Sequence, residues 1–371
     1  MVEVVAGCYE ELTLAYKLFS ENLNKEWKLE PSFTDHSHTG CVKALAISPK
    51  GVLATGSSDE TIKLFNVRKR VELGSLMHHD GTINCIDFYK NRFMFSGSCD
   101  GTIGVWNTSN WECLKTLRGH QGSVHSVAVH PSGKLALSIG ADKTLRTWNL
   151  MTCRKAFIKK LKKAANQLLW SPDGEKYIVG IENSIDIFQT ATTEIEHTIT
   201  CDSKIHRIVF CGTKHLLVAL ETGNVDVYDI ETNERKLSVK AHSCRVKCMY
   251  TLESGEIGHV LFTVCSDGLL KAWGLILDKE SIEMNFLAEV DTSFRLMCVT
   301  AWNTVANETT SERIESVSAV DSAEKTVSET SVKVQAKKRK GKVEIEETNG
   351  KLQKKSRKDK LAERILKAHV T

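Results

Sequence analysis

The chain has 371 residues, 41% of them hydrophobic, with 50 basic and 46 acidic side chains and a formal net charge of +4. Its amino terminus lacks the basic start and long apolar core of a secretory signal, and no run approaches the about 18 apolar residues of a transmembrane helix. These features argue against a secreted or membrane-embedded protein and predict a soluble, intracellular one.

Seven aromatic residues each end a short apolar strand at nearly constant spacing. Successive positions are 49, 41, 42, 40, 40 and 45 residues apart. A period of about 40–45 residues is typical of a four-stranded β-propeller blade of the WD40 type. We therefore predict an all-β, seven-bladed WD40 β-propeller. The seven residues are Tyr16, Phe65, Trp106, Trp148, Phe188, Tyr228 and Trp273.

The two ends of the repeat region each hold part of a blade. Val4–Gly7, Leu12–Leu18 and Trp27–Phe33 fit a second, third and fourth strand, and Phe294–Trp302 fits an innermost strand. Pairing the N-terminal strands with this C-terminal strand completes a seventh blade and leaves no long open sheet edge. The predicted propeller domain therefore spans residues 1–302.

Polar residues recur at fixed distances from the aromatic residue in four repeats. An aspartate precedes it by six positions, a hydroxyl residue precedes the aspartate by four, and a histidine precedes the aspartate by 21 to 25. This spacing predicts a buried hydrogen-bonded tetrad, because an unpaired buried polar group costs roughly 1–3 kcal/mol. The first repeat has Phe65 instead of tryptophan and lacks the last donor. The complete tetrads are His79, Ser96, Asp100 and Trp106; His120, Ser138, Asp142 and Trp148; and His242, Thr263, Asp267 and Trp273.

The same residue types also form catalytic triads, which is the enzymatic alternative. A nucleophile site occurs once in a chain, whereas this set recurs from repeat to repeat. The sequence also lacks a Walker loop, a Gly-x-Gly-x-x-Gly after a strand and a His-Glu-x-x-His motif. The tetrads are therefore predicted to be structural, and the protein is predicted to be no enzyme and to need no cofactor.

Repeats four and five keep the strands but lack the tetrad, so the strand pattern, and not a polar tetrad, is predicted to hold them. Three of the four prolines stand second in a turn that ends in glycine, and Pro31 falls in a predicted outermost strand. The eight strands are Ala165–Trp170, Tyr177–Ile181, Ser184–Phe188, Glu194–Thr200, Ile205–Phe210, His215–Leu220, Val225–Ile230 and Lys236–Lys240.

A lysine-rich segment joins the third and fourth repeats, and two further cations begin the sixth repeat. We predict that these six cations lie on one rim of the propeller and attract an acidic protein or RNA, a solvated loop being the alternative. The predicted partner rim comprises Lys159, Lys160, Lys162, Lys163, Arg245 and Lys247.

The twelve cysteines are scattered through strands and turns, so reduced thiols that fill sheet positions are the preferred interpretation. The closest pair, Cys244 and Cys248, stands near His242 and offers a metal site as the alternative. Because Cys248 falls within a predicted strand and His242 belongs to a tetrad, no metal site is predicted.

The charge changes abruptly after Trp302. Residues 303–330 carry two basic and six acidic side chains, and residues 331–371 carry fourteen basic and five acidic ones, net −4 and +9. An acidic disordered linker and a basic disordered tail are expected, because neither segment can bury enough apolar surface to order itself. Two dense basic blocks are typical of segments that nuclear import receptors bind and that attract phosphate backbones. The alternative is that they only solvate the tail. They comprise Lys337, Lys338, Arg339, Lys340 and Lys342, then Lys354, Lys355, Arg357, Lys358 and Lys360.

Five stretches go beyond the general repeat: Val5–Glu10, Trp111–Lys115, His130–Ser138, Asp142–Leu150 and Ala156–Lys159. They resemble one branch of the WD40 family, the p21-activated protein kinase-interacting proteins. The resemblance covers the propeller, while the tail matches in composition only. It implies a nucleolar protein that acts in maturation of the large ribosomal subunit. It also implies binding to p21-activated kinase and restraint of its activation by Rho-family GTPases.

Two functions from different classes follow. The first is a non-catalytic scaffold in ribosome biogenesis, with proteins of pre-60S particles as partners and direct contact with pre-ribosomal RNA left open. The alternative is a signalling adaptor that inhibits p21-activated kinase. Retention in the nucleus and nucleolus and attraction to RNA require dense positive charge, whereas a cytosolic kinase inhibitor does not. We therefore favour the scaffold. It is expected to be a monomer within larger assemblies.

Overall fold

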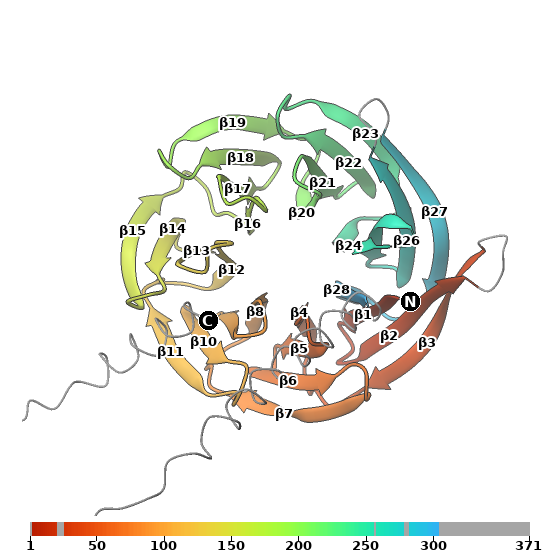
Figure 1. Cartoon of the computed structure of the whole chain (residues 1–371), viewed down its shortest axis with the longest axis horizontal. Helices are drawn as coiled ribbons and strands as arrows, with labels where there is room; N and C mark the ends of the chain where they lie inside the picture. Colours follow the sequence, from red (N-terminus) through yellow and green to blue (C-terminus); the bar gives the residue numbers. More distant parts are fainter. Residues whose placement is uncertain (1, 21–25, 256, 278–281, 304–371) are drawn as a thin grey trace, which may run out of the picture. The chain divides into compact units, whose positions relative to one another are not determined.

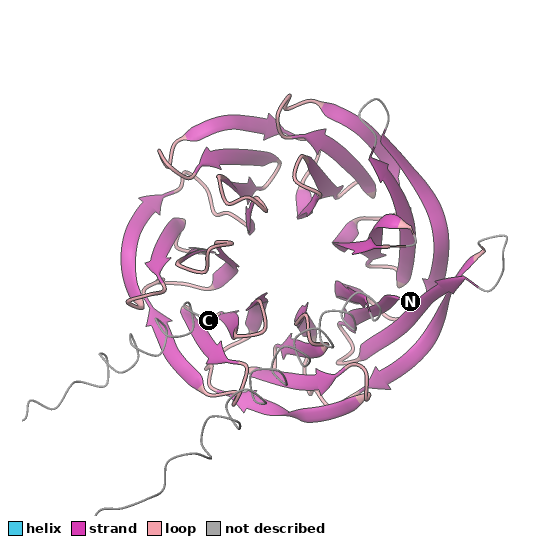
Figure 2. Ribbon diagram, in the orientation of Figure 1, coloured by secondary structure: helices cyan, strands magenta, loops and turns pink. Residues whose placement is uncertain are grey.

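The computed structural model describes residues 2–20, 26–255, 257–277 and 282–303, which contain twenty-eight β-strands. They form seven four-stranded sheets arranged as blades around one axis (Figure 1). Figure 2 shows strands and loops but no helix in this part of the chain, so no described segment could cross a membrane as a helix. The predicted seven-bladed propeller is confirmed. The predicted linker and tail lie outside the described residues from residue 304 onward.

In six blades the strands follow chain order from the innermost strand to the outermost. Blade one has β4 (Val42–Ile47), β5 (Val52–Ser57), β6 (Thr61–Asn66) and β7 (Val71–Met77); blade two β8 (Ile83–Tyr89), β9 (Phe93–Ser98), β10 (Thr102–Asn107) and β11 (Cys113–Arg118); blade three β12 (Val124–Val129), β13 (Leu135–Gly140), β14 (Thr144–Asn149) and β15 (Arg154–Lys160). Blade four has β16 (Gln167–Trp170), β17 (Lys176–Ile181), β18 (Ser184–Gln189) and β19 (Ile195–Thr200); blade five β20 (Ile205–Cys211), β21 (His215–Leu220), β22 (Asn224–Asp229) and β23 (Arg235–Lys240); blade six β24 (Val246–Ser254), β25 (Gly258–Cys265), β26 (Leu269–Leu277) and β27 (Ile282–Asp291).

The burial of each strand follows from its place in the blade. Second strands such as β13 and β17 are buried at five of six positions, because neighbouring blades cover both sheet faces. Their sequences are accordingly short apolar runs with little alternation. The seven periodic aromatic residues are all buried in third strands. At each of them the pairing with the fourth strand shifts register, so the recurrent aromatic residue marks a recurrent β-bulge.

Blade seven joins the two ends of the propeller, as predicted. Its strands run from innermost to outermost as β28 (Leu296–Asn303), β1 (Val2–Cys8), β2 (Thr13–Ser20) and β3 (Trp27–Asp35). All seven residues of β1 are buried, and β1 pairs antiparallel with both neighbours. Pro31 lies in the edge strand β3, where its missing N–H removes no ladder bond.

Trp302 of β28 joins blade seven to blade one. Its Nε1–H donates to the Pro49 carbonyl at 3.2 Å, and its indole covers Gly51 so closely that a Cβ there would lie 2.9 Å from the ring. Gly51 has φ +81° and ends the predicted turn with a 2.9 Å bond from its N–H to the Ser48 carbonyl. Glycine is therefore required at position 51 by both the turn and the indole.

Blades four and five contain buried polar contacts that the sequence pattern did not predict. The Gln167 amide in β16 donates to the Ile208 carbonyl at 2.6 Å and accepts from the Ile208 N–H at 2.7 Å, which ties blade four to blade five. Asp226 in β22 is fully buried and accepts from the Ser238 hydroxyl at 2.6 Å and from Arg235 at 3.4 Å. These polar contacts lie outside the tetrad spacing and add to the apolar packing of the two blades.

Candidate functional site

The tetrads of blades two and three are assembled as their spacing predicted. In blade two, the Trp106 indole N–H donates to Ser96 Oγ at 2.8 Å, and Ser96 Oγ lies 2.7 Å from His79 Nε2. His79 Nδ1 lies 3.1 Å from the Asp100 carboxylate. The indole can only donate, so the serine proton goes to Nε2 and the Nδ1–H goes to the aspartate. The equivalent distances in blade three are 2.8, 2.7 and 3.0 Å.

The electrostatics of the blade-three tetrad suit a structural role. Although burial raises the pKa of Asp142, hydrogen bonds from the Gln121 N–H, Thr144 and His120 lower it to about 2. Burial lowers the pKa of His120, so the imidazole is neutral at neutral pH. Ser138 is fully buried, with its proton held by the histidine, so its oxygen is not available to a substrate.

Blade six joins only three of its four predicted members. His242 Nε2 lies 2.8 Å from Thr263 Oγ1, which also accepts from the Trp273 indole at 3.0 Å. His242 Nδ1, however, is buried without a hydrogen-bond partner among the described residues. The Asp267 carboxylate is instead engaged by the thiol of Cys265 and by the Ser243 hydroxyl. The predicted complete tetrad is therefore wrong in blade six.

The predicted partner rim is not one surface. Lys159 lies within strand β15, where its Nζ donates to the Thr193 carbonyl at 2.6 Å and sits 4.6 Å from the centre of the Phe188 ring. Lys163 forms an ion pair with Glu182 at 2.7 Å. Both side chains are thus directed to blade four, and the remaining members of this lysine cluster, Lys160 and Lys162, are exposed.

Arg245 and Lys247 do not extend that rim. The Arg245 guanidinium donates to Ser266 Oγ at 3.0 Å within blade six. Lys247 instead lines a cavity of about 230 Å³ with Asp87 and Arg207, where burial lowers the lysine pKa. Innermost strands of all seven blades contribute to this cavity, so it lies on the propeller axis.

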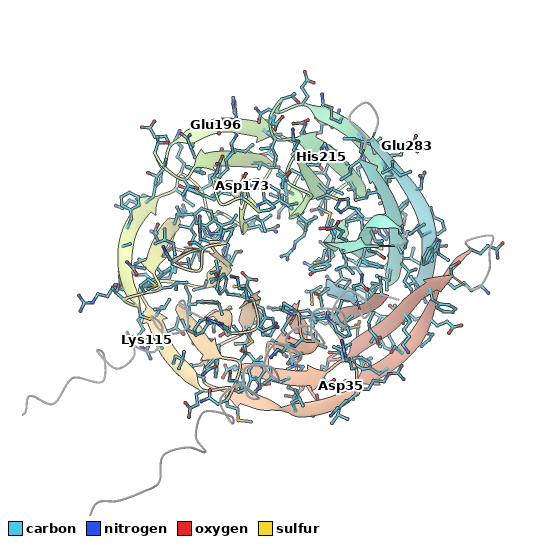
Figure 3. All side chains as sticks on the ribbon, in the orientation of Figure 1. Asp35, Lys115, Asp173, Glu196, His215 and Glu283 are labelled. Carbon is cyan, nitrogen blue, oxygen red and sulfur yellow. The ribbon has the colours of Figure 1, made fainter. Side chains whose placement is uncertain are left out.

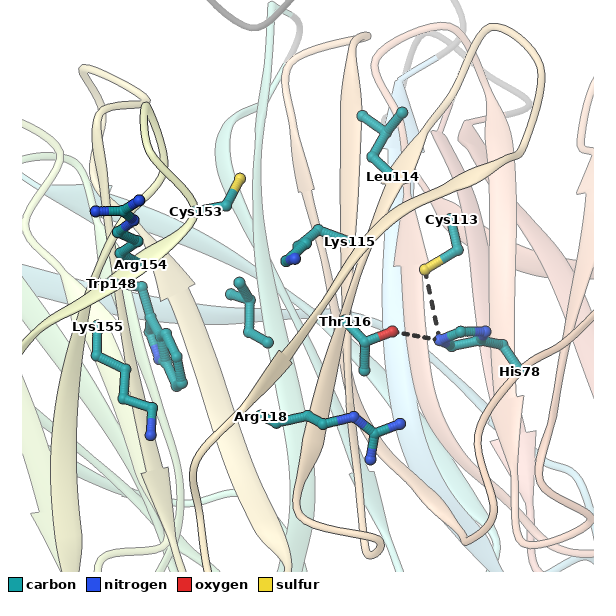
Figure 4. Close-up of a pocket in the computed structure, with 11 residues that line it drawn as sticks. His78, Cys113, Leu114, Lys115, Thr116, Arg118, Trp148, Cys153, Arg154 and Lys155 are labelled. Carbon is teal, nitrogen blue, oxygen red and sulfur yellow. Dashed lines mark hydrogen bonds between the residues drawn. The ribbon is translucent and has the colours of Figure 1, made fainter. Parts of the chain in front are cut away.

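A larger groove of about 640 Å³ lies between blades two and three. Lys115 and Arg118 of β11 and Arg154 and Lys155 of β15 line it. In Figure 4 the Lys115 side chain points toward the β15 residues, whereas the Arg118 guanidinium lies on the side of Thr116 and His78. Because these are outermost strands, the groove opens at the circumference of the ring, where Lys115 is seen in Figure 3. None of the four cations has an ion-pair partner within the part of the chain that the structure describes. We call these four residues the basic groove.

The lining of the basic groove favours binding over chemistry. Gly119 follows the lining residue Arg118, and a Cβ there would lie 2.9 Å from the Arg146 guanidinium and 3.0 Å from the Trp148 indole. Burial raises the pKa of the Cys113 and Cys153 thiols, so neither is an activated nucleophile at neutral pH. Cations of both strands that lack acidic partners give this pocket a positive potential, which attracts an anionic ligand.

Sequence reasoning missed the basic groove because its two halves belong to different repeats. Lys115 and Arg118 are separated from Arg154 and Lys155 by most of a blade, and neither pair forms a dense run. The available signal was that both pairs fall in the outermost strands of consecutive repeats, which neighbouring blades bring together. The ten basic tail residues between Lys337 and Lys360, by contrast, lie outside the described residues.

Comparison with known proteins identifies relatives along most of the chain. The family model of the WD domain, G-beta repeat, matches residues 27–66, 70–107 and 111–149. The p21-activated protein kinase-interacting protein 1 of Homo sapiens is 47% identical over 305 residues, which are 81% of this chain and 77% of that protein. Protein MAK11 of Saccharomyces cerevisiae is 26% identical over 80% of this chain and 82% of its own length. Shk1 kinase-binding protein 15 of Schizosaccharomyces pombe is 27% identical, covering 77% and 82%.

Proposed function

Since this chain belongs to the family of the p21-activated protein kinase-interacting proteins, which are WD40-repeat propellers, we propose that it is a non-catalytic scaffold for large ribosomal subunit assembly in the nucleolus. The observation that carries the proposal is the basic groove, a concave site with four unpaired cations and no activated nucleophile. The net charge of +9 on residues 331–371 supports it from the sequence, because such charge favours contact with RNA-rich particles.

The basic groove takes an extended acidic segment of an assembly protein. Its walls are the outermost strands β11 and β15, and the cations that these strands contribute can neutralise carboxylates along an extended chain. A single-stranded RNA would need exposed aromatic faces for its bases, whereas the Trp148 indole at the floor is only 2% exposed. The groove therefore suits a protein partner, and RNA contact is assigned to the tail.

Reversing the four groove charges should abolish binding of an acidic peptide. With Lys115, Arg118, Arg154 and Lys155 changed to glutamate, a fluorescent deca-glutamate peptide should bind at least about tenfold more weakly, because like charges now face it. Fluorescence anisotropy at low and physiological salt measures the effect. The matched control reverses four exposed lysines elsewhere: Lys50, Lys69, Lys134 and Lys204.

Both variants change the net charge by the same amount, so a nonspecific effect of charge would weaken binding equally. An equal loss in the two variants would contradict a binding site in the groove. Circular dichroism of both variants confirms that the propeller remains folded.

Neutralising the basic tail should reduce nucleolar accumulation and the salt dependence of particle binding. Glutamine at Lys337, Lys338, Arg339, Lys340, Lys354, Lys355, Arg357 and Lys358 lowers the charge of residues 331–371 from +9 to +1. Fewer counterions are then released on binding, so the slope of affinity against salt should fall. Imaging of the tagged variant and co-sedimentation at two salt concentrations measure both effects. Unchanged localisation together with an unchanged slope of affinity against salt would show that the tail only solvates the protein.

Kinase binding is a second candidate function, because two relatives are a p21-activated protein kinase-interacting protein and an Shk1 kinase-binding protein. In that role the propeller would bind p21-activated kinase and restrain its activation by Rho-family GTPases. The tail-neutralised protein separates the two functions. It should bind particles and their RNA more weakly and keep kinase binding, since the propeller strands contain none of the altered residues.

A further inference from the structure

Blade six differs from blades one and two at two positions next to its histidine and aspartate. The residue two positions after the histidine is Gly40 in blade one and Gly81 in blade two, but Cys244 in blade six. The residue two positions before the aspartate is Ser57 or Ser98 in those blades and Cys265 in blade six. All twelve cysteines of the chain lie within the described residues and are free thiols.

The other blades show that these two positions touch. Ser57 Oγ donates to the Gly40 carbonyl at 2.8 Å, and Ser98 Oγ donates to the Gly81 carbonyl at 2.9 Å. A side chain added at Gly40 would place its Cβ 3.3 Å from Ser57 Oγ. The repeat geometry therefore places Cys244 and Cys265 at neighbouring positions of blade six.

His242 supplies a buried nitrogen with no partner at the same place. In blades one to three the equivalent Nδ1 lies 2.8, 3.1 and 3.0 Å from the aspartate. His242 keeps the Nε2 contact to Thr263, which fixes its ring in the same orientation, yet its Nδ1 has no hydrogen-bond partner among the described residues. The residue is only 2% exposed, so this unpaired nitrogen is buried.

The remaining ligand atoms converge on this nitrogen. One ligand atom each from His242, Cys265 and Asp267 lies within 4.8 Å of the others. The Cys265 thiol donates to the Asp267 carboxylate, and the Cys244 thiol interacts with the same carboxylate. We propose that His242 Nδ1, the Cys244 and Cys265 sulfurs and an Asp267 oxygen form a tetrahedral zinc site.

The donor set and the geometry suit Zn²⁺. Two thiolates, an imidazole and a carboxylate are among its usual ligands, and bonds of about 2.0–2.3 Å place ligand atoms about 3.5 Å apart. Closing the cluster requires side-chain rotations of His242, Cys265 and Asp267 from their 4.8 Å spacing, and of Cys244, whose thiol now lies 3.8 Å from the Arg245 carbonyl. Histidine bound through Nδ1 carries its proton on Nε2 and donates it to Thr263 Oγ1, which lies 2.8 Å away and fixes the ring.

Zinc binds cysteine as the thiolate, so binding releases the protons of the two thiols. Asp267 and Ser243 are exposed and Cys244 is partly exposed, so the ion can enter from solvent.

The test uses the full chain, stripped of metal by a chelator and kept reduced, and titrated with Co²⁺ and then Zn²⁺. We expect one equivalent of Co²⁺ to give the visible bands of a tetrahedral site and the near-ultraviolet band of thiolate ligation, which Zn²⁺ then removes. Zinc should also raise the melting temperature. The double variant Cys244→Gly, Cys265→Ser restores the residues of blades one and two, so it should fold. It should bind zinc at least about 100-fold more weakly than the unaltered protein. Such a loss is larger than that expected from removing a residue that only contacts a ligand.

Cys99→Ser is the matched control, because Cys99 is an exposed thiol in the equivalent turn of blade two, next to Asp100. It should bind zinc like the unaltered protein. The absence of thiolate bands, or equal binding by the double variant, would overturn the proposal. A Cys244–Cys265 disulfide that forms in air and is not prevented by stoichiometric zinc would overturn it as well.

Discussion

A chain lacking residues 1–18 is expected to aggregate or to be insoluble. The deletion removes β1 and most of β2, so the edge of β28 and the inner edge of β3 lose their partners. It also removes seven buried apolar residues of one core cluster, which extends into blade six: Val2, Val4, Ala6, Cys8, Leu14, Tyr16 and Leu18. An unpaired apolar strand edge is a template for intermolecular pairing. Size-exclusion chromatography after expression measures the outcome.

Truncation after residue 310 is the control for this deletion. It removes more residues but leaves all twenty-eight described strands intact, so a soluble monomer is expected. A folded, monomeric protein without residues 1–18 would contradict the pairing of β28 with β1. Poor solubility of both truncations would show that the defect is not specific to blade seven.

Asp142→Ala should lower the free energy of unfolding by about 2–4 kcal/mol, because it leaves several buried donors without an acceptor. The carboxylate accepts from His120 Nδ1 at 3.0 Å, from the Gln121 N–H at 3.0 Å and from the Thr144 N–H at 3.1 Å. Asp142→Asn should cost less than the alanine, since the amide keeps the shape and one acceptor oxygen. Urea denaturation followed by tryptophan fluorescence measures both variants.

Asp173→Ala is the matched control, because this aspartate also accepts a backbone hydrogen bond within a tight turn. It bonds the Glu175 N–H at 2.9 Å but lies exposed at the surface, where water replaces a lost partner. The expected loss of unfolding free energy is therefore below about 1 kcal/mol. Equal losses for Asp142→Ala and Asp173→Ala would show that the tetrad does not stabilise its blade.

The fold could be predicted because each repeat carries its own markers. The buried aromatic residue at each β-bulge gives the period, and the incomplete blades at the two ends predict their own pairing. Contacts between blades were harder to foresee. The hydrogen bond from Gln167 to the Ile208 carbonyl joins residues 41 positions apart, and no sequence pattern in β16 predicts it. Asp226 in blade five stands two positions before the aromatic residue Tyr228, outside the tetrad spacing, so its buried network left no periodic signal.

The candidate sites were harder to predict than the fold, because they depend even more on contacts between residues far apart in the sequence. Spacing correctly predicted the tetrads of blades two and three, where each member occupies the expected place. In blade six the same spacing concealed a difference, because Cys265 engages Asp267 and leaves His242 Nδ1 unpaired. The basic groove arises where β11 and β15 become neighbours across two blades. Dense runs such as Lys159–Lys163 drew attention in the sequence, although the structure directs two of their side chains to blade four.

Affinity purification of the tagged full-length chain from nuclear extract, at low and high salt, tests the proposed scaffold most directly. The co-eluting proteins and RNA are identified for the unaltered chain, the groove variant and the tail-neutralised variant. We predict precursor particles of the large ribosomal subunit with the unaltered chain, fewer assembly proteins with the groove variant, and less RNA retained with the tail variant. Recovery of a kinase without ribosomal precursors at either salt concentration would contradict the scaffold and favour the signalling adaptor.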